Sequence, residues 1–342
     1  MRQPSKPIPV GIIILLFGFC FGRANAQTNP YHMLDNWAQL PPGRTLGSVI
    51  GVDVDREGHV WALERCGGNT CVGSDLDPIL EFDPSGKFLK SFGARMFVFP
   101  HGLYLDKDGN VWATDGKGEG GKGQQVLKFS PTGELLLALG KRGVAGDGPD
   151  TFNAPSDVVV APDGTIFVAD GHGEGTNARI VKFTKDGKFI KTWGKFGSGP
   201  GEFGLPHSID IDSSGRLFVG DRDNNRIEIF NQNGEYLGEW KQFGRPSGVF
   251  IDSHDNLYVA DAESTPKTNP GFQQGVRIAS TRDGIVKFLI PPQELPADAV
   301  YNRPLAPGEK PVTRTASIAA DSMGNLYGAE GGTRSLRKYI KD

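Results

Sequence analysis

The sequence predicts an all-β protein, a six-bladed β-propeller, because one pattern recurs along the chain. A short apolar strand, an Asp-x-x-Gly type of turn and a second strand ending near Ala-Asp occur six times in the 342 residues. The glycine position of the turn holds, in order and 40 to 69 residues apart, Gly58, Gly109, Gly164, Gly215, Asp255 and Gly324. Repeats of about 40 to 50 residues that contain only short strands and turns are typical of propeller blades.

Each repeat supplies the first two strands of a blade, over residues 51–62, 102–115, 156–170, 208–221, 248–261 and 317–330. One position of the second strand is aromatic in the first five repeats, which is typical of a blade core: Trp61, Trp112, Phe167, Phe218 and Tyr258. The chain ends soon after Tyr339, too early for a complete sixth blade. We therefore expect a strand between Tyr31 and Leu40 to close the ring.

The first 26 residues have the pattern of a secretory signal peptide. Arg2 and Lys6 precede an apolar run over residues 11–22, and Ala24-Asn25-Ala26 forms a small-residue cleavage site before Gln27. We expect residues 27–342 to be the mature protein, one propeller domain that is secreted or periplasmic. No later stretch approaches the roughly 20 apolar residues of a membrane helix, so we expect no membrane span.

The charge balance and the cysteines indicate which partners to expect and which covalent link the protein contains. The chain has 37 basic and 40 acidic residues, and removal of the signal peptide takes away three basic residues and no acidic one. A mildly acidic surface argues against nucleic acid as a partner, because that binding needs concentrated positive charge. We expect a monomer. Cys20 leaves with the signal peptide, so Cys66 and Cys71 remain as an isolated pair in an oxidising compartment, and we expect them to form a disulfide.

The alternation of turns in a propeller sorts polar residues between its two faces. The Asp-x-x-Gly turns share one face, here called the turn face, which carries His59 and His254. The entries to the first strands and the loops after the second strands share the other face. We call it the histidine-bearing face, and its candidate site residues are Arg65, His101, His172 and His207.

His101 and His207 predict a metal site. They belong to the second and fourth blades, and a threefold site on a sixfold ring would take its third ligand from the sixth blade, which offers Ala316. Zinc bound by three protein nitrogens, with one open position, is a catalytic arrangement. His172 lies at the same channel mouth and could supply the third nitrogen, or it could act as a general base. The alternative is that these histidines only line a wet channel and bind backbone and water.

Arg65 is the candidate for substrate binding. Its planar guanidinium suits two-point recognition of a carboxylate. A small-molecule or peptide substrate with a carboxylate would therefore fit beside the histidines. The alternative is a simple ion pair between Arg65 and Glu64 or another neighbouring acid, which contributes little when exposed.

The repeats resemble NHL repeats over nearly all of the mature chain. A more specific likeness lies in Ala169-Asp170-Gly171, Arg179-Ile180-Val181-Lys182-Phe183, Trp193-Gly194, Pro200-Gly201-Glu202-Phe203 and Pro206-His207-Ser208. These motifs are similar to those of peptidyl-α-hydroxyglycine α-amidating lyase. The resemblance implies a zinc ion held by three histidines, a tyrosine and an arginine at the reacting centre, and a structural calcium ion.

The residues of that lyase are only partly retained. Two zinc histidines correspond to His101 and His207, whereas the third position is Ala316. The arginine corresponds to Arg65, and His172 stands where the family has its tyrosine. The calcium ligands of the family correspond to the backbone carbonyls of Val52 and Leu103 and to an aspartate replaced here by Ser317.

Three functions remain open. The first is a zinc-dependent lyase that cleaves a carbinolamide N–C bond to an amide and glyoxylate, with Arg65 holding the carboxylate. The second is a non-catalytic NHL propeller that binds a peptide, glycan or protein on the histidine-bearing face. The third is a calcium-dependent lactonase-type propeller. Such sites need carboxylates and amides at the channel, whereas the inner strands here open with His101, Ser156, His207 and Ser247, so the third is disfavoured.

Overall fold

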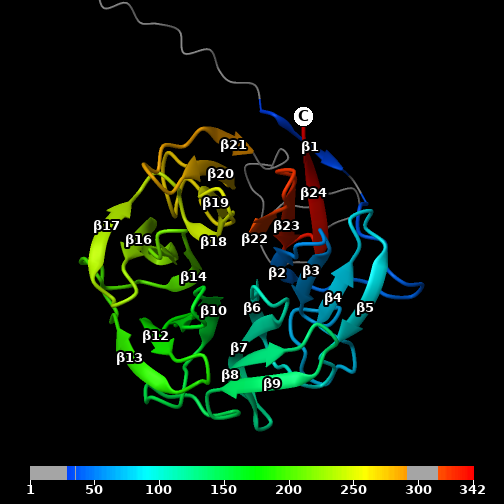
Figure 1. Ribbon diagram of the computed structural model, residues 1–342, viewed down its shortest axis with the longest axis horizontal. Coiled ribbons are helices and arrows are strands. Elements are labelled where there is room, and N and C mark those ends of the chain that lie inside the picture. The colour runs from blue at the N-terminus through cyan, green and yellow to red at the C-terminus, as the bar shows by residue number, and fades with distance from the viewer. Residues whose placement is uncertain (1–28, 35, 291–314) are drawn as a thin grey trace, which may run out of the picture.

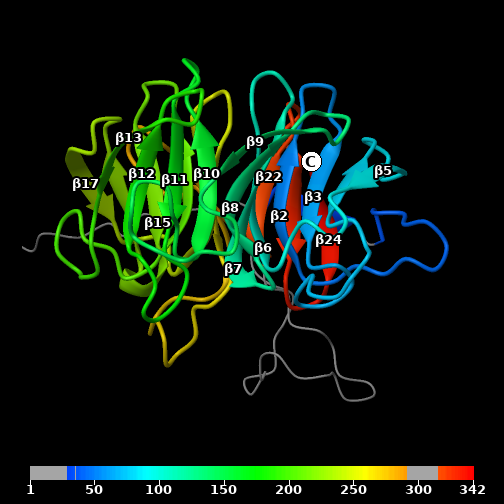
Figure 2. The same cartoon turned by 90° about the horizontal axis from the view of Figure 1, so that it is seen from below.

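The computed structural model describes residues 29–34, 36–290 and 315–342. Within these ranges the chain forms six four-stranded antiparallel sheets arranged in a ring (Figure 1). The inner strands line a cavity along the axis of the ring, here called the central channel. The strands of each sheet run between two faces of the ring, where the turns and loops lie (Figure 2). The predicted all-β six-bladed propeller is confirmed.

Four strands make each of the first three blades, given from the channel outward. Blade 1 contains β2 (Val49–Val54), β3 (Val60–Glu64), β4 (Ile79–Phe82) and β5 (Phe88–Phe92). Blade 2 contains β6 (Pro100–Leu105), β7 (Val111–Glu119), β8 (Lys122–Phe129) and β9 (Leu135–Leu139). Blade 3 contains β10 (Pro155–Val160), β11 (Ile166–Asp170), β12 (Arg179–Phe183) and β13 (Phe189–Trp193).

The other three blades follow the same order. Blade 4 contains β14 (Pro206–Ile211), β15 (Leu217–Asp221), β16 (Arg226–Phe230) and β17 (Tyr236–Trp240), with the 3-10 helix η1 (Arg222–Asn224) after β15. Blade 5 contains β18 (Pro246–Ile251), β19 (Asn256–Asp261), β20 (Gly275–Ser280) and β21 (Phe288–Ile290). Blade 6 contains β22 (Thr315–Ala320), β23 (Leu326–Glu330), β24 (Ser335–Lys341) and β1 (Tyr31–Leu34).

The ring is closed by the N-terminal strand. β1 pairs antiparallel with β24, with Tyr31 opposite Lys341 and Leu34 opposite Lys338. It thereby becomes the outermost strand of blade 6, beside the C-terminal strand (Figure 1). Trp37, just after it, is buried and packs edge-on against Tyr327 of the same blade. The expected closing strand is confirmed, although it ends at Leu34.

The recurring turn has a common chemistry that explains the repeat. In blade 2, Asp106 accepts hydrogen bonds from the backbone N–H groups of Asp108 and Asn110. Its second carboxylate oxygen accepts the indole N–H of Trp112 at 3.1 Å. Aspartate caps tight turns in this way because its oxygens reach the free donors two and four residues on. Trp61, Tyr258 and Tyr327 bind the turn aspartates of their own blades in the same way, whereas Phe167 and Phe218 only fill the core.

Every inner strand carries an irregularity where it enters the channel. The pairing of the first two strands of each blade shifts register at its start, for example between Pro206 and Ser208 in blade 4. A β-bulge of this kind re-aims one side chain. The residues within the six irregularities are Ile50, His101, Ser156, His207, Ser247 and Ala316, with Gly102 also unpaired in blade 2. Two of the three candidate histidines owe their position to these bulges.

Cys66 and Cys71 form a disulfide, as expected. The predicted signal peptide lies outside the described residues. None of the helices in the described ranges is long and apolar enough to cross a membrane.

Candidate metal and anion site

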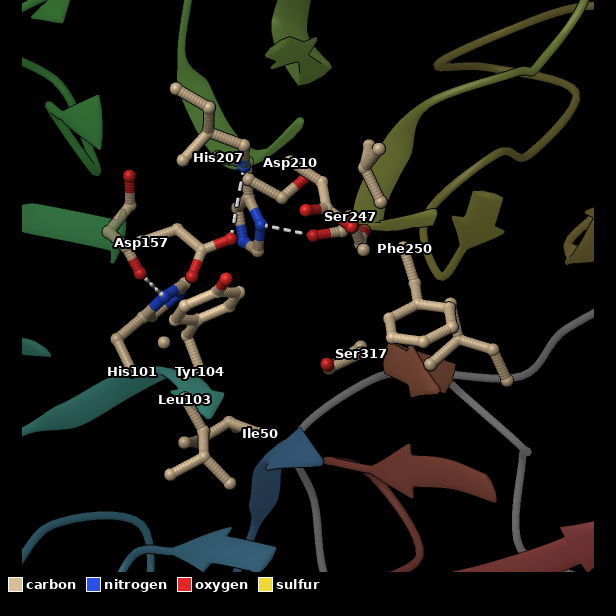
Figure 3. Close-up of a pocket in the computed structure, with 18 of the residues that line it drawn as sticks. Ile50, His101, Leu103, Tyr104, Asp157, His207, Asp210, Ser247, Phe250 and Ser317 are labelled. Carbon is tan, nitrogen blue, oxygen red and sulfur yellow. Dashed lines mark hydrogen bonds between the residues drawn. The ribbon is translucent and has the colours of Figure 1, made fainter. Parts of the chain in front are cut away.

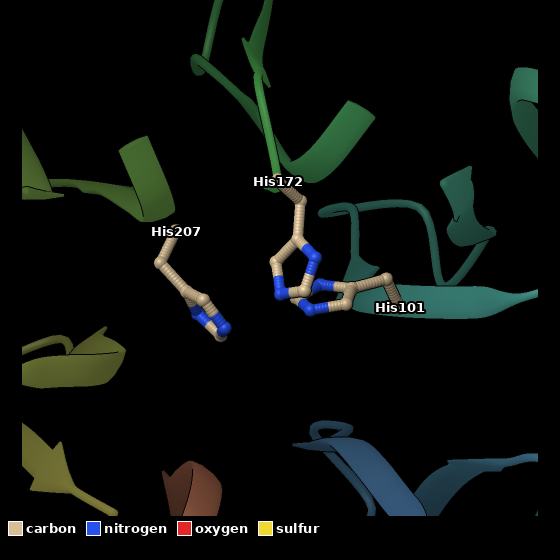
Figure 4. A group of neighbouring side chains, drawn as sticks. All are labelled: His101, His172 and His207. Atoms are coloured by element: carbon tan, nitrogen blue, oxygen red, sulfur yellow. The ribbon is translucent and has the colours of Figure 1, made fainter. Parts of the chain in front are cut away.

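The three histidines of the histidine-bearing face meet at the mouth of the central channel (Figure 4). The ring centroid of His101 lies 4.2 Å from that of His172 and 4.7 Å from that of His207. The centroids of His172 and His207 are 5.0 Å apart. One ring nitrogen from each histidine lies within 4.8 Å of the others, so the group could hold a metal ion.

His172 reaches this cluster because its loop turns sharply after β11. Gly171 has a φ of +146° and Gly173 a φ of +137°. These backbone angles are accessible to glycine and rarely to other residues. A Cβ on Gly171 would also collide with the carbonyl oxygen of Asn177. The two glycines thus allow the loop to fold back over the channel mouth.

Backbone carbonyl groups hold two of the histidines in one orientation. Nδ1 of His101 lies 2.7 Å from the carbonyl oxygen of Ser156, and Nδ1 of His207 lies 2.6 Å from that of Ser247 (Figure 3). Because a carbonyl oxygen only accepts, Nδ1 of each ring is assigned as the N–H donor. Each Nε2 atom then keeps its lone pair. Metal-binding histidines are commonly oriented by such an outer hydrogen bond.

The three imidazoles are neutral at neutral pH. Burial, followed by the charge of Arg65, lowers the pKa of His101 to about 3. Burial also lowers the pKa of His172 and of His207 well below the usual value, with nearby Arg222 and neighbouring histidines adding to the effect. Neutral imidazole is the form that binds metal ions.

Arg65 lies beside the three histidines, and two hydrogen bonds and one aromatic ring hold its guanidinium in place. Its Nε donates to the carbonyl oxygen of Pro100 at 3.2 Å, and its Nη1 donates to Oδ1 of Asn69 at 2.7 Å. The guanidinium carbon lies 3.5 Å from the centre of the Phe99 ring. Burial lowers the pKa of Arg65 to about 9, so the side chain is charged at neutral pH.

The alternative ion pair between Arg65 and Glu64 is wrong. Glu64 is fully buried and accepts hydrogen bonds from Arg44 and from the backbone N–H groups of Gly47 and Gly67. The carboxylate is therefore engaged on its own side of the strand. No carboxylate of the described residues forms an ion pair with Arg65, so its positive charge at the channel mouth favours binding of an anion.

A second arginine belongs to the site and was missed by the sequence reasoning. Arg222 follows Asp221 at the repeat position that Arg65 occupies after Glu64, in the blade opposite across the ring. Its positive charge lowers the pKa of each of the three histidines. It pairs loosely with Glu263, at 3.5 Å, from the insertion after β19. Alignment of the repeats was the signal that would have revealed it.

The channel below the histidines is lined by carboxylates that join neighbouring blades. Asp53 accepts the N–H of Leu105 at 2.7 Å, and Asp210 accepts the N–H of Ile251 at 2.6 Å. Asp157 bridges in the same way to Ile209 (Figure 3). Burial raises the pKa of Asp53 and of Asp157 to about 7. The same cavity is lined by the residues corresponding to the family's calcium ligands and third histidine, Val52, Leu103, Ala316 and Ser317.

The two remaining histidines of the ring turns lie apart from this site. His59 on the turn face contacts Asp55 at 3.5 Å and Glu81 at 2.9 Å, and this trio is a second group whose geometry could hold a metal ion. Lys90 lies 2.8 Å from the other oxygen of Glu81, so an ion-pair network already accounts for it. His254 is exposed.

Comparison with known proteins supports the same architecture. A family model described as a 6-bladed beta-propeller matches residues 150–258. The chain is 28% identical over 301 residues to the NHL repeat-containing protein 3 of Mus musculus, which covers 86% of this chain and 80% of that protein. It is 32% identical over 208 residues to the Caenorhabditis elegans protein named "Probable peptidyl-alpha-hydroxyglycine alpha-amidating lyase". The chain is a six-bladed propeller that resembles NHL repeat-containing proteins and the amidating lyases.

The match to the amidating relatives is partial in length. It covers 56% of this chain and 57% of the nematode protein. A 40% identical stretch covers 61% of this chain but 23% of the peptidyl-glycine alpha-amidating monooxygenase of Mus musculus. Among solved structures, the streptogramin B lyase structure superposes with a TM-score of 0.58 at 16% identity, over 91% of this chain and 98% of that one, and this likeness concerns the fold.

Proposed function

We propose that this protein is a zinc-dependent lyase that cleaves the N–C bond of an N-acyl-α-hydroxyglycine. The observation that carries the proposal is the meeting of three neutral imidazoles beside Arg65, which has no carboxylate partner among the described residues. Three neutral nitrogens suit zinc. An arginine fork suits the carboxylate that such a substrate carries.

The residues present fit a zinc ion, although one ligand differs from the family. His172 replaces the nitrogen that is absent at Ala316, because its ring lies next to those of His101 and His207. Zinc bound there would supply a Lewis acid for the substrate's hydroxyl oxygen. The carbonyl groups of Ser156 and Ser247 keep two ligand nitrogens directed at one point, which avoids the cost of ordering them on binding.

The two arginines would orient the substrate across the channel mouth. Arg65 would hold the carboxylate, since its guanidinium is already fixed by Pro100, Asn69 and Phe99. Arg222 adds positive potential from the opposite blade, although it also contacts Glu263 at 3.5 Å and Asp223 at 3.7 Å. The positive pair also attracts anionic substrates into the mouth.

His172 serves the metal in this proposal and is then not available as the general base. This consequence favours a second candidate, a non-catalytic propeller that binds a peptide, glycan or protein on the histidine-bearing face. The long match to an NHL repeat-containing protein is the observation in its favour. We also propose that the protein is exported, which the disulfide supports.

Metal analysis followed by an assay separates these candidates. Mature protein, residues 27–342, is purified without chelator and its metals are measured by mass spectrometry beside a His101→Ala, His207→Ala double variant. We expect about one zinc per chain, lost in the double variant. The His254→Ala variant is the control, because this exposed residue lies on the turn face. Absence of metal from the wild type contradicts the lyase and leaves the non-catalytic propeller.

Turnover then distinguishes the lyase from the binding protein. The zinc-loaded protein is given an N-acyl-α-hydroxyglycine, and glyoxylate release is measured. Release that disappears in Arg65→Ala while zinc stays bound supports the lyase. Zinc without any release, together with carboxylate binding measured by calorimetry, supports the second candidate.

A further inference from the structure

The residues that follow Arg65 form a small closed loop against the guanidinium. Cys66 and Cys71 are joined by the disulfide, and Asn69 lies between them. Nη1 of Arg65 donates to Oδ1 of Asn69 at 2.7 Å. Asn69 is exposed and makes no other side-chain hydrogen bond within the described chain. Its position depends on the loop rather than on burial in the core.

The loop is also fastened to the segment that leads to the first histidine ligand. The N–H of Cys71 and the hydroxyl of Thr70 both donate to the carbonyl oxygen of Val98, each at 2.9 Å. Phe99, the residue after Val98, lies under the guanidinium of Arg65, and the carbonyl oxygen of Pro100 accepts from its Nε. The loop and residues 98–101 therefore form one rigid frame around Arg65, and His101 ends that frame.

This frame leaves one nitrogen of Arg65 open. Nε and Nη1 are engaged, and the described residues offer no acceptor to Nη2. A guanidinium held at two nitrogens and one face loses little side-chain freedom when a carboxylate binds at the third nitrogen. The acceptor at Asn69 is neutral, so it orients the fork without cancelling its charge.

We propose that the Cys66–Cys71 loop is a positioning element for the anion-binding arginine, with Asn69 as the positioning residue. The inference rests on the proposed lyase function and assigns the loop the task of setting affinity for the substrate's carboxylate. The disulfide contributes by restricting the loop to the conformation in which Asn69 faces Arg65. The disulfide also holds the backbone of Cys66 in the left-handed region, with a φ of +50°.

The test compares Asn69→Ala, Asn69→Asp and a Cys66→Ser, Cys71→Ser double variant with wild type, using an N-acyl-α-hydroxyglycine as substrate. We expect Asn69→Ala to raise KM about tenfold with kcat within about twofold, as expected for loss of one hydrogen bond to a charged group. Asn69→Asp keeps the acceptor but pairs the guanidinium with a carboxylate, so its KM should rise further. The double serine variant should resemble Asn69→Ala.

Two further measurements separate positioning from a structural effect. Zinc content and melting temperature of Asn69→Ala should equal those of wild type, because the side chain is exposed. Asn233→Ala, an exposed turn asparagine in blade 4, is the matched control and should leave KM unchanged.

The outcomes are distinguishable. Wild-type turnover with an unchanged KM in Asn69→Ala overturns the inference and leaves the lyase in place. An Asn69→Ala variant that loses zinc or kcat instead of affinity overturns it as well. Wild-type protein that holds zinc but shows no turnover overturns the lyase and the inference with it. If the double serine variant fails to fold, the two Asn69 variants still decide.

Discussion

The two ends of the central channel are built on different rules. On the turn face, an aspartate at one repeat position caps the first turn in five blades. These residues are Asp55, Asp106, Asp212, Asp252 and Asp321. At the histidine-bearing end, the residue within the bulge of the inner strand varies between blades: Ile50, His101, Ser156, His207, Ser247 and Ala316. Repeated chemistry maintains the fold at one end, and departures from the repeat make the site at the other.

The largest effect is expected from a substitution on the turn face, which should lower stability and leave metal binding unchanged. Asp106→Ala removes the cap of two backbone donors and the partner of Trp112, and we expect a loss of about 3 kcal/mol in the free energy of unfolding. Zinc content should be unchanged. Urea denaturation measures the first quantity. Asp108→Ala, in the same turn but exposed, is the control and should change stability by less than about 0.5 kcal/mol. Equal losses in the two variants would contradict the common role of the capping aspartate.

The channel between the two ends should show an inverted pH dependence. Burial raises the pKa of Asp53 to about 7 in the folded protein, whereas the unfolded value is about 3.9. Between these values the folded state holds a proton that the unfolded state has released. Stability contributed by Asp53 is therefore present at low pH and lost as pH rises toward 7. We expect wild type to lose about 2 kcal/mol more than Asp53→Asn between pH 5 and pH 7.

Thermal or urea unfolding at several pH values measures this difference. The comparison with the variant cancels the titration of the histidines, which are common to both proteins. Asp108→Asn, whose carboxylate is exposed, should follow the wild-type profile. Parallel profiles for wild type and Asp53→Asn would show that the buried carboxylate stays ionised.

The smallest effect on stability is expected from a substitution in the group of Asp55, His59 and Glu81 on the turn face. His59→Asn introduces the residue found at the same turn position in blades 2, 5 and 6, at Asn110, Asn256 and Asn325. In those blades the amide donates to the turn aspartate, so we expect stability to change by less than about 0.5 kcal/mol. Zinc stoichiometry should be that of wild type. A lower zinc content would mean that the group of Asp55, His59 and Glu81 is itself a metal site.

Most of the fold could be predicted because its signals are local and repeated. Strand alternation and capped turns depend on residues a few positions apart, so the six blades are visible in the chain itself. The closing strand followed from counting strands in the last repeat, and the disulfide from counting cysteines. Predicting the exact end of β1 failed, because Trp37 leaves the strand to pack in the core of blade 6.

The sequence by itself determined the ring, the face of each histidine and the candidate arginine. Only the tertiary structure decided that His172 joins His101 and His207, since that depends on a glycine-rich loop whose path is set by Asn177. It also decided that Glu64 binds Arg44, so that Arg65 has no carboxylate partner among the described residues. The physical reason is the same in both cases. The position of a loop and the partner of a charged side chain depend on contacts with residues that are not adjacent in the sequence. These contacts form only when the ring is assembled, so the local sequence pattern does not reveal them.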